Sequence, residues 1–199
     1  MQVRVLGPIR VGCAGDLREP RGARPRDVLA VLLSRRGRPL PAEVLLDLVW
    51  GDEAPGLTAA TVHTVVARLR RQLGDGLVET NHVGYLIPSA ISTDADRLTE
   101  LATAAQEAEL AGRVAEREEL CRLALDLWQG STPYDGVPDD LVLAERVRLE
   151  ELHRRLRADL AEVLLASPKP SALDEAMPLA RDLWESNPLD ERAAGLLMR

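Results

Sequence analysis

Two stretches of the chain predict short strands: hydrophobic and polar positions alternate over the first 20 residues, and two short segments flank a possible turn between residues 77 and 87. Alternation of this kind is typical of short strands with one buried face. The first stretch has Gly7-Pro8 in its middle, which predicts two strands joined by a turn. In the second, residues 77–80 and 85–87 flank Asn81-His-Val-Gly84, a spacing that predicts a β-hairpin.

Between these stretches, apolar residues recur at the spacing of amphipathic helices. The pattern predicts helices over residues 27–36, 42–50 and about 58–73, each followed by a glycine that ends it. Strands, three helices and a hairpin, in that order, are the plan of a winged helix-turn-helix. We therefore expect this fold in the first part of the chain.

Beyond Pro88 the pattern changes to long helices alone. They are predicted over about 94–111, 114–129, 139–166 and 171–186, with a last helix from 188 to the end. We therefore expect one domain over residues 1–90 and a helical domain over residues 91–199. The predicted fold class is mainly α with a small β component.

A short motif recurs within the helical half. Ala124-Leu-Asp-Leu-Trp128 is echoed by Ala180-Arg-Asp-Leu-Trp184, which favours an array of helical repeats over chance similarity between Ala- and Leu-rich helices. Both tryptophans, like Trp50, lie in apolar stripes. We interpret all three as core anchors rather than as a platform for a ligand.

Composition narrows the class of protein further. Aromatic residues make up 3% of the chain and Phe is absent, so the cores must consist mainly of Leu, Val and Ala, which favours packed helices.

The longest apolar run, Val28–Leu33, is far shorter than the roughly 20 residues of a membrane span. We expect a soluble cytoplasmic protein that does not contact a membrane. Cys13 and Cys121 are too far apart in sequence to suggest a disulfide framework.

Charge is distributed unequally between the two halves. The whole chain has a net charge of −7. Residues 1–90 contain 12 basic and 9 acidic residues, a net charge of +3, whereas residues 91–199 contain 13 basic and 23 acidic residues, a net charge of −10. A basic half that binds nucleic acid, joined to an acidic half that binds other partners, would show this asymmetry.

The helix predicted over residues 58–73 has two contrasting faces. Its apolar side lies within about 100° of arc and contains Val62, Val65, Val66, Leu69 and Leu73. The opposite side contains Ala60, Thr64, Ala67, Arg68 and Arg71, flanked by Thr61 and His63, with Arg70 at the margin. No Asp or Glu occurs from Leu57 to Leu73, although the chain has 32 acidic residues.

This polar face suits the major groove of DNA. Small residues let the helix approach the base edges, Arg can contact guanine through two hydrogen bonds, and Thr can contact a thymine methyl group or a phosphate. An ordinary solvated basic helix is the alternative interpretation. The surrounding order of strands and helices favours DNA binding.

The sequence also resembles the Streptomyces antibiotic regulatory protein family. The resemblance rests on Leu6-Gly-Pro-Ile-Arg-Val11, Arg24-Pro-Arg26, Leu48-Val-Trp-Gly51, Val62-His63, Ala67-Arg-Leu-Arg-Arg-Gln-Leu-Gly74, Val83-Gly-Tyr-Leu86, Ala124-Leu-Asp-Leu-Trp-Gln-Gly130, Glu150-Glu-Leu-His153 and Asn187-Pro-Leu-Asp-Glu-Arg192. These motifs span nearly the whole chain. The family joins an OmpR-type winged helix to a tetratricopeptide-like bacterial transcriptional activator domain.

The resemblance implies a DNA-binding transcriptional activator that is specific for one biosynthetic pathway, such as that of an antibiotic. Such a protein binds direct repeats in double-stranded DNA, as a homodimer there, and recruits RNA polymerase holoenzyme without a cofactor. The resemblance places the base-facing positions at Thr61, His63, Thr64 and Arg68, and the phosphate contacts at Arg24, Arg26, Arg70 and Arg71. The wing residues would be Asn81, His82 and Tyr85.

Two features depart from the family pattern. Relatives usually carry an Arg in the wing shortly before the Gly-Tyr pair, whereas this chain has Asn81. Relatives also continue through at least one more helix after the position of Met198. We therefore expect the second domain to be incomplete at its C-terminus, whether the chain is a natural short form, a truncated chain or the front of a larger protein.

Other chemistry has little support in the sequence. His63, His82 and His153 lack the spacing of metal ligands, and neither a Gly-rich phosphate loop nor a nucleophile motif occurs, so we expect no metal and no enzymatic activity. The second hypothesis is a protein-interaction or ligand-sensing module in which the winged helix docks protein. The acid-free third helix argues against it.

Overall fold

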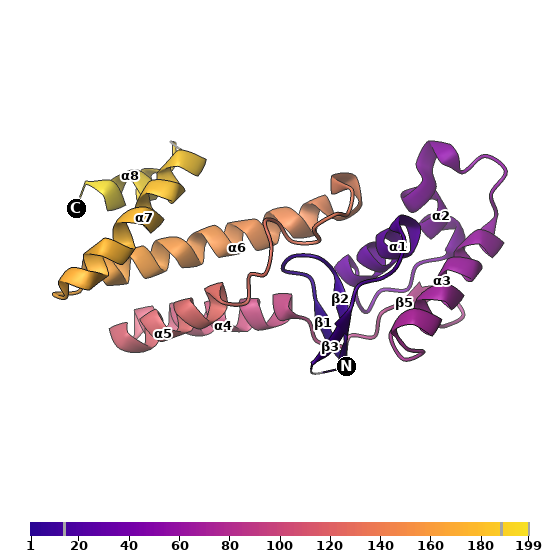
Figure 1. Cartoon of the computed structure of the whole chain (residues 1–199), viewed down its shortest axis with the longest axis horizontal. Helices are drawn as coiled ribbons and strands as arrows, with labels where there is room; N and C mark the ends of the chain where they lie inside the picture. Colours follow the sequence, from indigo (N-terminus) through magenta and orange to yellow (C-terminus); the bar gives the residue numbers. More distant parts are fainter. Residues whose placement is uncertain (14, 188, 199) are drawn as a thin grey trace. The chain divides into compact units, whose positions relative to one another are not determined.

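The computed structural model describes residues 1–13, 15–187 and 189–198, and these form two compact units (Figure 1). The first unit consists of Met1–Asp94 and Gln129–Val147, and the second of Ala95–Trp128 and Arg148–Arg199. The chain therefore leaves the first unit, returns to it and leaves it again.

The first unit begins with an antiparallel sheet of three strands, β1 (Gln2–Arg4), β2 (Arg10–Cys13) and β3 (Asp16–Arg18), in the order β1-β2-β3. The alternation correctly predicted β1 and β2, whose Val3 and Val11 are paired and buried. It did not predict β3, because one apolar residue between two charged residues is too short a pattern to indicate a strand.

Three helices follow: α1 (Ala23–Ser34), α2 (Ala42–Trp50) and α3 (Ala59–Leu73), with a short 3-10 helix, η1 (Gly51–Glu53), after α2. Helix α1 is the central one, since every residue from Val28 to Leu33 is buried. Leu45 and Val49 of α2 and Leu69 of α3 are buried as well. This core fixes which side of α3 remains exposed.

The hairpin consists of β4 (Glu79–Thr80) and β5 (Tyr85–Leu86). It is anchored to the loop between α1 and α2, because the amide groups of Leu40 and Tyr85 each donate to the other's carbonyl oxygen, at 2.8 and 2.9 Å. A Cβ atom at Gly84 would lie 2.0 Å from the carbonyl oxygen of Leu40. Only glycine therefore permits this approach.

Residues 129–147 complete the first unit. The amide of Gln129 donates to the carbonyl of Leu6 at 2.7 Å, and the amide of Tyr134 donates to the carbonyl of Val5 at 2.8 Å. The buried guanidinium of Arg146 donates to carbonyl oxygens of this same segment. The sequence-based division at residue 90 did not anticipate that this segment bonds to the connection between β1 and β2.

The second unit is helical, as expected. Its elements are α4 (Asp94–Leu110), α5 (Val114–Leu125), α6 (Asp139–Leu165), α7 (Pro170–Ser186) and α8 (Glu191–Leu197); α4 and α6 each begin in the first unit. The predicted start of the last helix at Pro188 lies outside the described residues. The fold class, a small β component with a helical second half, is confirmed.

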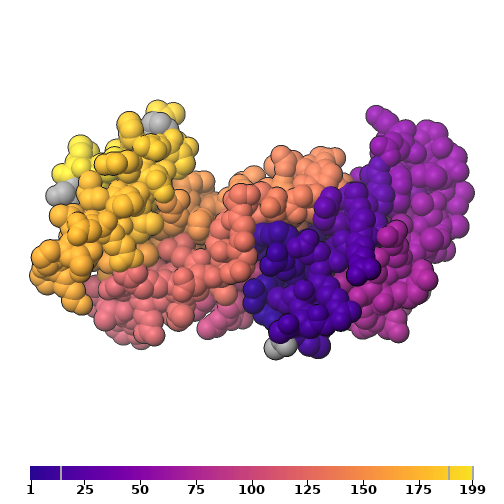
Figure 2. Space-filling model, in the orientation of Figure 1, coloured from indigo at the N-terminus to yellow at the C-terminus, as the bar shows by residue number. Residues whose placement is uncertain are grey.

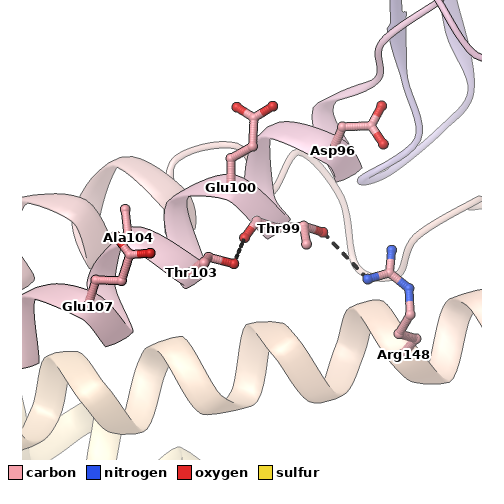
Figure 3. A pocket seen from close by; sticks show the side chains of 7 residues that line it. All are labelled: Asp96, Thr99, Glu100, Thr103, Ala104, Glu107 and Arg148. Carbon is pink, nitrogen blue, oxygen red and sulfur yellow. Dashed lines mark hydrogen bonds between the residues drawn. The ribbon is translucent and has the colours of Figure 1, made fainter. Parts of the chain in front are cut away.

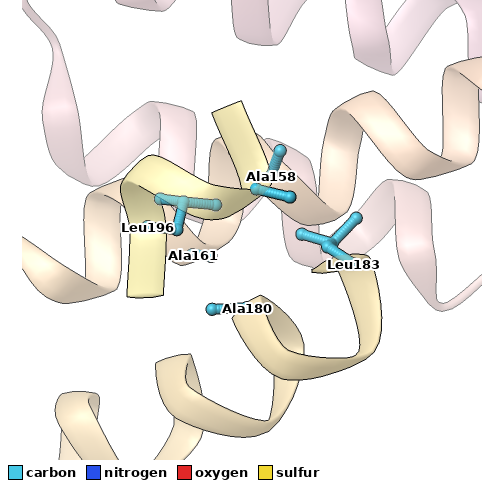
Figure 4. Close-up of a cluster of buried hydrophobic side chains, with 6 residues drawn as sticks. Ala158, Ala161, Ala180, Leu183 and Leu196 are labelled. Atoms are coloured by element: carbon cyan, nitrogen blue, oxygen red, sulfur yellow. The ribbon is translucent and has the colours of Figure 1, made fainter. Parts of the chain in front are cut away.

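The second unit has a core of small residues, which lets its helices approach closely (Figure 4). The cluster contains Ala158 and Ala161 of α6, Ala180 and Leu183 of α7, and Ala193 and Leu196 of α8. Beside it, the carboxylate of Asp159 accepts hydrogen bonds from Arg117 of α5 at 2.8 Å and from Arg192 of α8 at 2.6 Å. Ion pairs therefore add to the contacts between α5, α6 and α8.

The interpretation of all three tryptophans as core anchors is wrong for Trp184, which is 42% exposed. Trp50 is buried, and the ring of Trp128 stacks on that of His153 at 4.0 Å between centroids. The two tryptophans of the repeated motif therefore have different surroundings. In an Ala-rich helix pair the small residues fill the interface and leave the larger side chain outside.

Candidate nucleic-acid interface

The exposed face of α3 matches the face predicted from the sequence. Val62, Val66 and Leu69 point into the core, and His63, Thr64, Ala67, Arg68 and Arg71 are exposed. Thr61 is half-buried at the edge of this face. In the space-filling view, the purple region that contains α2 and α3 is part of the surface of the first unit (Figure 2). Helix α3 thus offers a continuous surface without a carboxylate.

Two side chains on this face are oriented by the helix itself. The hydroxyl of Thr64 donates to the carbonyl of Ala60 at 2.9 Å, which turns its methyl group and its oxygen lone pairs outward. The Nε of Arg71 donates to the carbonyl of Ala67 at 3.4 Å. Thr64 therefore retains its methyl group and the acceptor capacity of its oxygen, and Arg71 retains its two Nη groups.

Arg68 lies close to the start of α1. A Cβ atom built on Gly22 would lie 3.8 Å from Nη2 of Arg68, so the guanidinium passes next to this glycine. Within the described part of the chain, no hydrogen bond or ion pair engages the Arg68 side chain. Its donors are therefore available to a ligand.

Arg70 is directed toward the hairpin instead. Its Nε donates to the carbonyl of Val78 at 2.9 Å, and its Nη2 donates to the hydroxyl of Thr80 at 2.7 Å. Its guanidinium also lies 6.0 Å from the ring centroid of Tyr85. Arg70 therefore joins α3 to the hairpin, and Nη1 is left for an outside contact.

Arg24 and Arg26, at the start of α1, are both partly engaged within the first unit. Arg24 donates to the carbonyl of Val49 and to the carboxylate of Glu53, and it lies 5.6 Å from the ring centroid of Trp50. Each of the two arginine side chains keeps 35% of its surface exposed. Both side chains are therefore partly accessible to a ligand.

Between these arginines lies a buried carboxylate, that of Asp27, which is 3% exposed. It is 4.0 Å from Arg24 and 3.9 Å from Arg26. Burial raises the pKa of Asp27, while the two arginines oppose that rise. The carboxylate also partly cancels the positive charge that α1 presents.

The structure places the three predicted wing residues in different roles. Asn81 closes the hairpin turn, because its side-chain oxygen accepts from the amides of Val83 at 2.9 Å and Gly84 at 3.0 Å. His82 is exposed in the turn. Tyr85 is 8% exposed, and its ring meets the edge of the His63 ring at 6.0 Å between centroids. Tyr85 thus supports α3 from inside.

The second unit contains a shallow groove of a different character, with a volume of about 620 Å³. Its lining includes the carboxylates of Asp96, Glu100 and Glu107 from α4 and the guanidinium of Arg148 from α6 (Figure 3). Arg148 donates to the hydroxyl of Thr99 at 3.5 Å. The acidic lining makes this groove unsuitable for DNA.

Sequence reasoning missed Arg18, Arg21 and Gln72, which lie together beside the C-terminal turn of α3. The only signal was the high density of arginine between residues 18 and 26. Without the strand β3, nothing in the sequence brought these residues next to α3.

Two further observations concern metal binding and membrane spans in the described residues. They include no group of three His, Cys, Asp or Glu side chains that could hold a metal ion. No helix among them is long and apolar enough to cross a membrane.

Comparison with known proteins agrees with this architecture. The family model of the bacterial transcriptional activator domain matches residues 93–199, and that of the C-terminal domain of transcriptional regulatory proteins matches residues 21–87. A solved structure of Mycobacterium tuberculosis EmbR in complex with a low affinity phosphopeptide shares the fold, with a TM-score of 0.85 and 24% identity over 98% of this chain and 53% of that chain.

Curated relatives extend the comparison. Regulatory protein AfsR of Streptomyces coelicolor is 36% identical over 201 residues, which cover 98% of this chain and 19% of that protein. Regulatory protein DnrI of Streptomyces peucetius is 29% identical over 203 residues, which cover 92% of this chain and 75% of that protein. The chain thus spans about a fifth of the length of AfsR.

The fold and these matches define the class: a winged-helix domain of the type found in transcriptional regulatory proteins, followed by a bacterial transcriptional activator domain. The chain belongs to the Streptomyces antibiotic regulatory protein family, as its motifs suggested.

Proposed function

We propose that the chain is a sequence-specific DNA-binding transcriptional activator, and that α3 is its recognition helix. The observation that carries this proposal is the exposed, acid-free face of α3, held outward by the buried Val62, Val66 and Leu69. An α-helix fits the major groove of B-DNA, and the side chains on its outer face determine which bases it binds.

Each residue of this face has a distinct role in the proposed complex. Arg68 donates to a guanine, Thr64 offers its methyl group to a thymine or its hydroxyl oxygen to a donor, and Thr61 and His63 contact the bases at the edge of the helix. The small side chain of Ala67 lets the helix axis approach. Sequence preference then depends chiefly on Arg68.

The flanking arginines hold the protein to the DNA backbone. Arg71 contributes its outer guanidinium group, and Arg24, Arg26 and Arg70 contribute the donors that their internal bonds leave over. His82, at the exposed turn of the hairpin, reaches the minor groove. Asn81 supports this contact by holding the turn in place.

We further propose that two copies bind direct repeats beside a promoter of a biosynthetic gene cluster and recruit RNA polymerase holoenzyme. The names of the regulatory proteins AfsR and DnrI and the family support this role. The acidic second half supports a division of labour, since its net charge of −10 repels phosphate and suits contact with protein. It therefore binds DNA little by itself.

Selection from random double-stranded DNA tests the proposal. The full chain should enrich one motif, and titration should show binding to it at least about a thousandfold tighter than to a scrambled sequence. Thr64→Glu, which puts a carboxylate on the exposed face, should abolish enrichment, whereas Thr103→Glu on α4 should not. If the unaltered chain enriches no motif, the proposed function is wrong.

The second candidate function is a ligand-sensing or protein-interaction module. The acidic groove between α4 and α6 is the observation in its favour, because three carboxylates around an open volume of about 620 Å³ suit a cationic ligand. Failure of the DNA selection together with calorimetric binding of spermidine would favour this second function.

A further inference from the structure

A polar hollow of about 390 Å³ lies in the first unit, between β3, the connection from β3 to α1, and the end of α3. It is lined by Arg18, Glu19, Arg21, Arg71 and Gln72. Three guanidinium groups therefore face one carboxylate. The hollow adjoins the recognition helix but contains none of the base-facing residues.

The existing ion pairs leave the hollow cationic. Glu19 pairs with Arg10 at 3.1 Å, and Arg18 pairs with Asp16 at 2.6 Å. No hydrogen bond or ion pair within the described ranges engages the side chain of Arg21, and Arg71 bonds only to its own helix. Two guanidinium groups thus present donors that no carboxylate satisfies.

The position of Arg21 is fixed relative to α3. Its backbone amide donates to the side-chain oxygen of Gln72 at 3.0 Å, which ties the connection from β3 to the last turn of α3. Gly22 follows with φ of 103°, next to the guanidinium of Arg68. Arg21 and Arg71 are therefore held on the same side of the recognition helix as Arg68.

We propose that this hollow binds one phosphate group, with Arg21 and Arg71 as the two ligands. The inference rests on the proposed function, in which the phosphate belongs to the DNA backbone beside the major groove. Guanidinium groups bind phosphate oxygens through paired hydrogen bonds, which suits two arginines held side by side. Because Arg18, Arg21 and Arg71 are all exposed, the hollow favours a phosphate on a large surface over a small ligand that needs enclosure.

The test compares Arg21→Ala with Arg181→Ala, which removes the same charge from an exposed position on α7. The affinity of the full chain for its selected DNA motif is measured across salt concentrations. Arg21→Ala should lower affinity about tenfold at low salt and reduce the salt slope by about one unit, without changing the preferred bases. Arg21→Lys should retain most of the slope, and Arg181→Ala should change the affinity less than about twofold.

The outcomes separate this inference from the proposed function. If the unaltered chain binds its motif and Arg21→Ala matches Arg181→Ala, the phosphate hollow is wrong and the proposed function stands. If the chain binds no DNA, calorimetry with inorganic phosphate decides whether the hollow is a phosphate site. Phosphate binding that Arg21→Ala abolishes would identify a site for free phosphate, and absence of binding would overturn the inference.

Discussion

The Nε of Arg70 donates to the carbonyl oxygen of Val78 at 2.9 Å, which connects α3 to the residue just before β4, the first strand of the hairpin. A second donor of Arg70 bonds to Thr80. Arg70→Ala should therefore lower the free energy of unfolding by about 1 to 2 kcal/mol, because it leaves a partly buried carbonyl without its charged donor. Urea unfolding of the full chain measures this change.

Arg71→Ala is the matched control, because it removes the same side chain one residue later. Arg71 is exposed, so this change should alter stability by less than about 0.5 kcal/mol. It should instead weaken binding to all DNA sequences alike and reduce the salt slope by about one unit. Equal stability of the two variants would show that Arg70 does not support the hairpin.

Arg68→Ala should reduce sequence specificity. The guanidinium of Arg68 has no partner within the described part of the chain, so its loss should leave stability nearly unchanged. Affinity for the selected motif should fall by about 1 to 3 kcal/mol, and the preference at one base position should relax. Repeating the selection with the variant measures this preference. An unchanged motif would remove Arg68 from the base-facing residues.

Added charge in the hairpin turn should raise affinity for DNA. The family pattern has an Arg in the wing where this chain has Asn81, but Asn81 closes the turn by accepting from two backbone amides. His82→Arg places the charge at an exposed neighbour and preserves that turn. Its affinity should rise severalfold at low salt and less at high salt, and Asn81→Arg should gain less. A gain that does not depend on salt would contradict minor-groove contact.

Arg146→Met should destabilise the first unit, although residue 146 lies within the range matched by the activator domain. Arg146 is 7% exposed, and its guanidinium donates to the carbonyls of Pro133, Tyr134 and Val137. Its loss should cost about 2 to 4 kcal/mol. Hydrogen exchange at Gln129 and Tyr134 should accelerate, while Arg155→Met, at an exposed position of the same helix, should leave these amides protected.

Acid should destabilise the second unit through His153. Burial, together with the charge of Arg157, lowers the pKa of this imidazole to about 4 from its ordinary value of 6.5. The unfolded chain therefore takes up a proton between pH 6.5 and 4 that the folded chain refuses, so stability is complete above pH 6.5 and falls as the pH drops toward 4. At pH 5 the loss should be about 1 to 2 kcal/mol, since the ring is only partly buried.

His153→Phe provides the comparison for this pH effect. A phenyl ring keeps the stack on Trp128 but cannot accept a proton. Urea midpoints between pH 7 and pH 5 should shift less for this variant than for the unaltered chain. Identical shifts would assign the acid sensitivity to other groups.

Much of the fold could be predicted because its signals are local. The stripe of Val62, Val66 and Leu69 indicated the exposed face of α3, and glycines marked the ends of α2 and α3, whereas α1 ends at Ser34, before the predicted Gly37. The apolar stripe repeats over several turns of one helix, and each glycine lies directly after the helix that it ends. The family resemblance then placed the winged helix before the activator domain.

The remaining features depend on contacts between distant segments. Nothing near Tyr85 in the sequence indicates that its ring turns inward against His63, and nothing near Arg21 indicates that Gln72 accepts its amide. The exposure of Trp184 depends likewise on how small its neighbours in α7 and α8 are. Periodicity identifies a buried face, but it does not identify the partner of that face.

The return of the chain to its first unit constrains how the protein is made. Because the amides of Gln129 and Tyr134 bond to Leu6 and Val5, the first unit remains incomplete until residues up to about 147 have left the ribosome. The carbonyl groups of Val5 and Leu6, which follow β1, therefore lack these partners while α4 and α5 are synthesised. A polypeptide released early would lack this closing segment, so folded first units without the helical half should seldom accumulate in the cell.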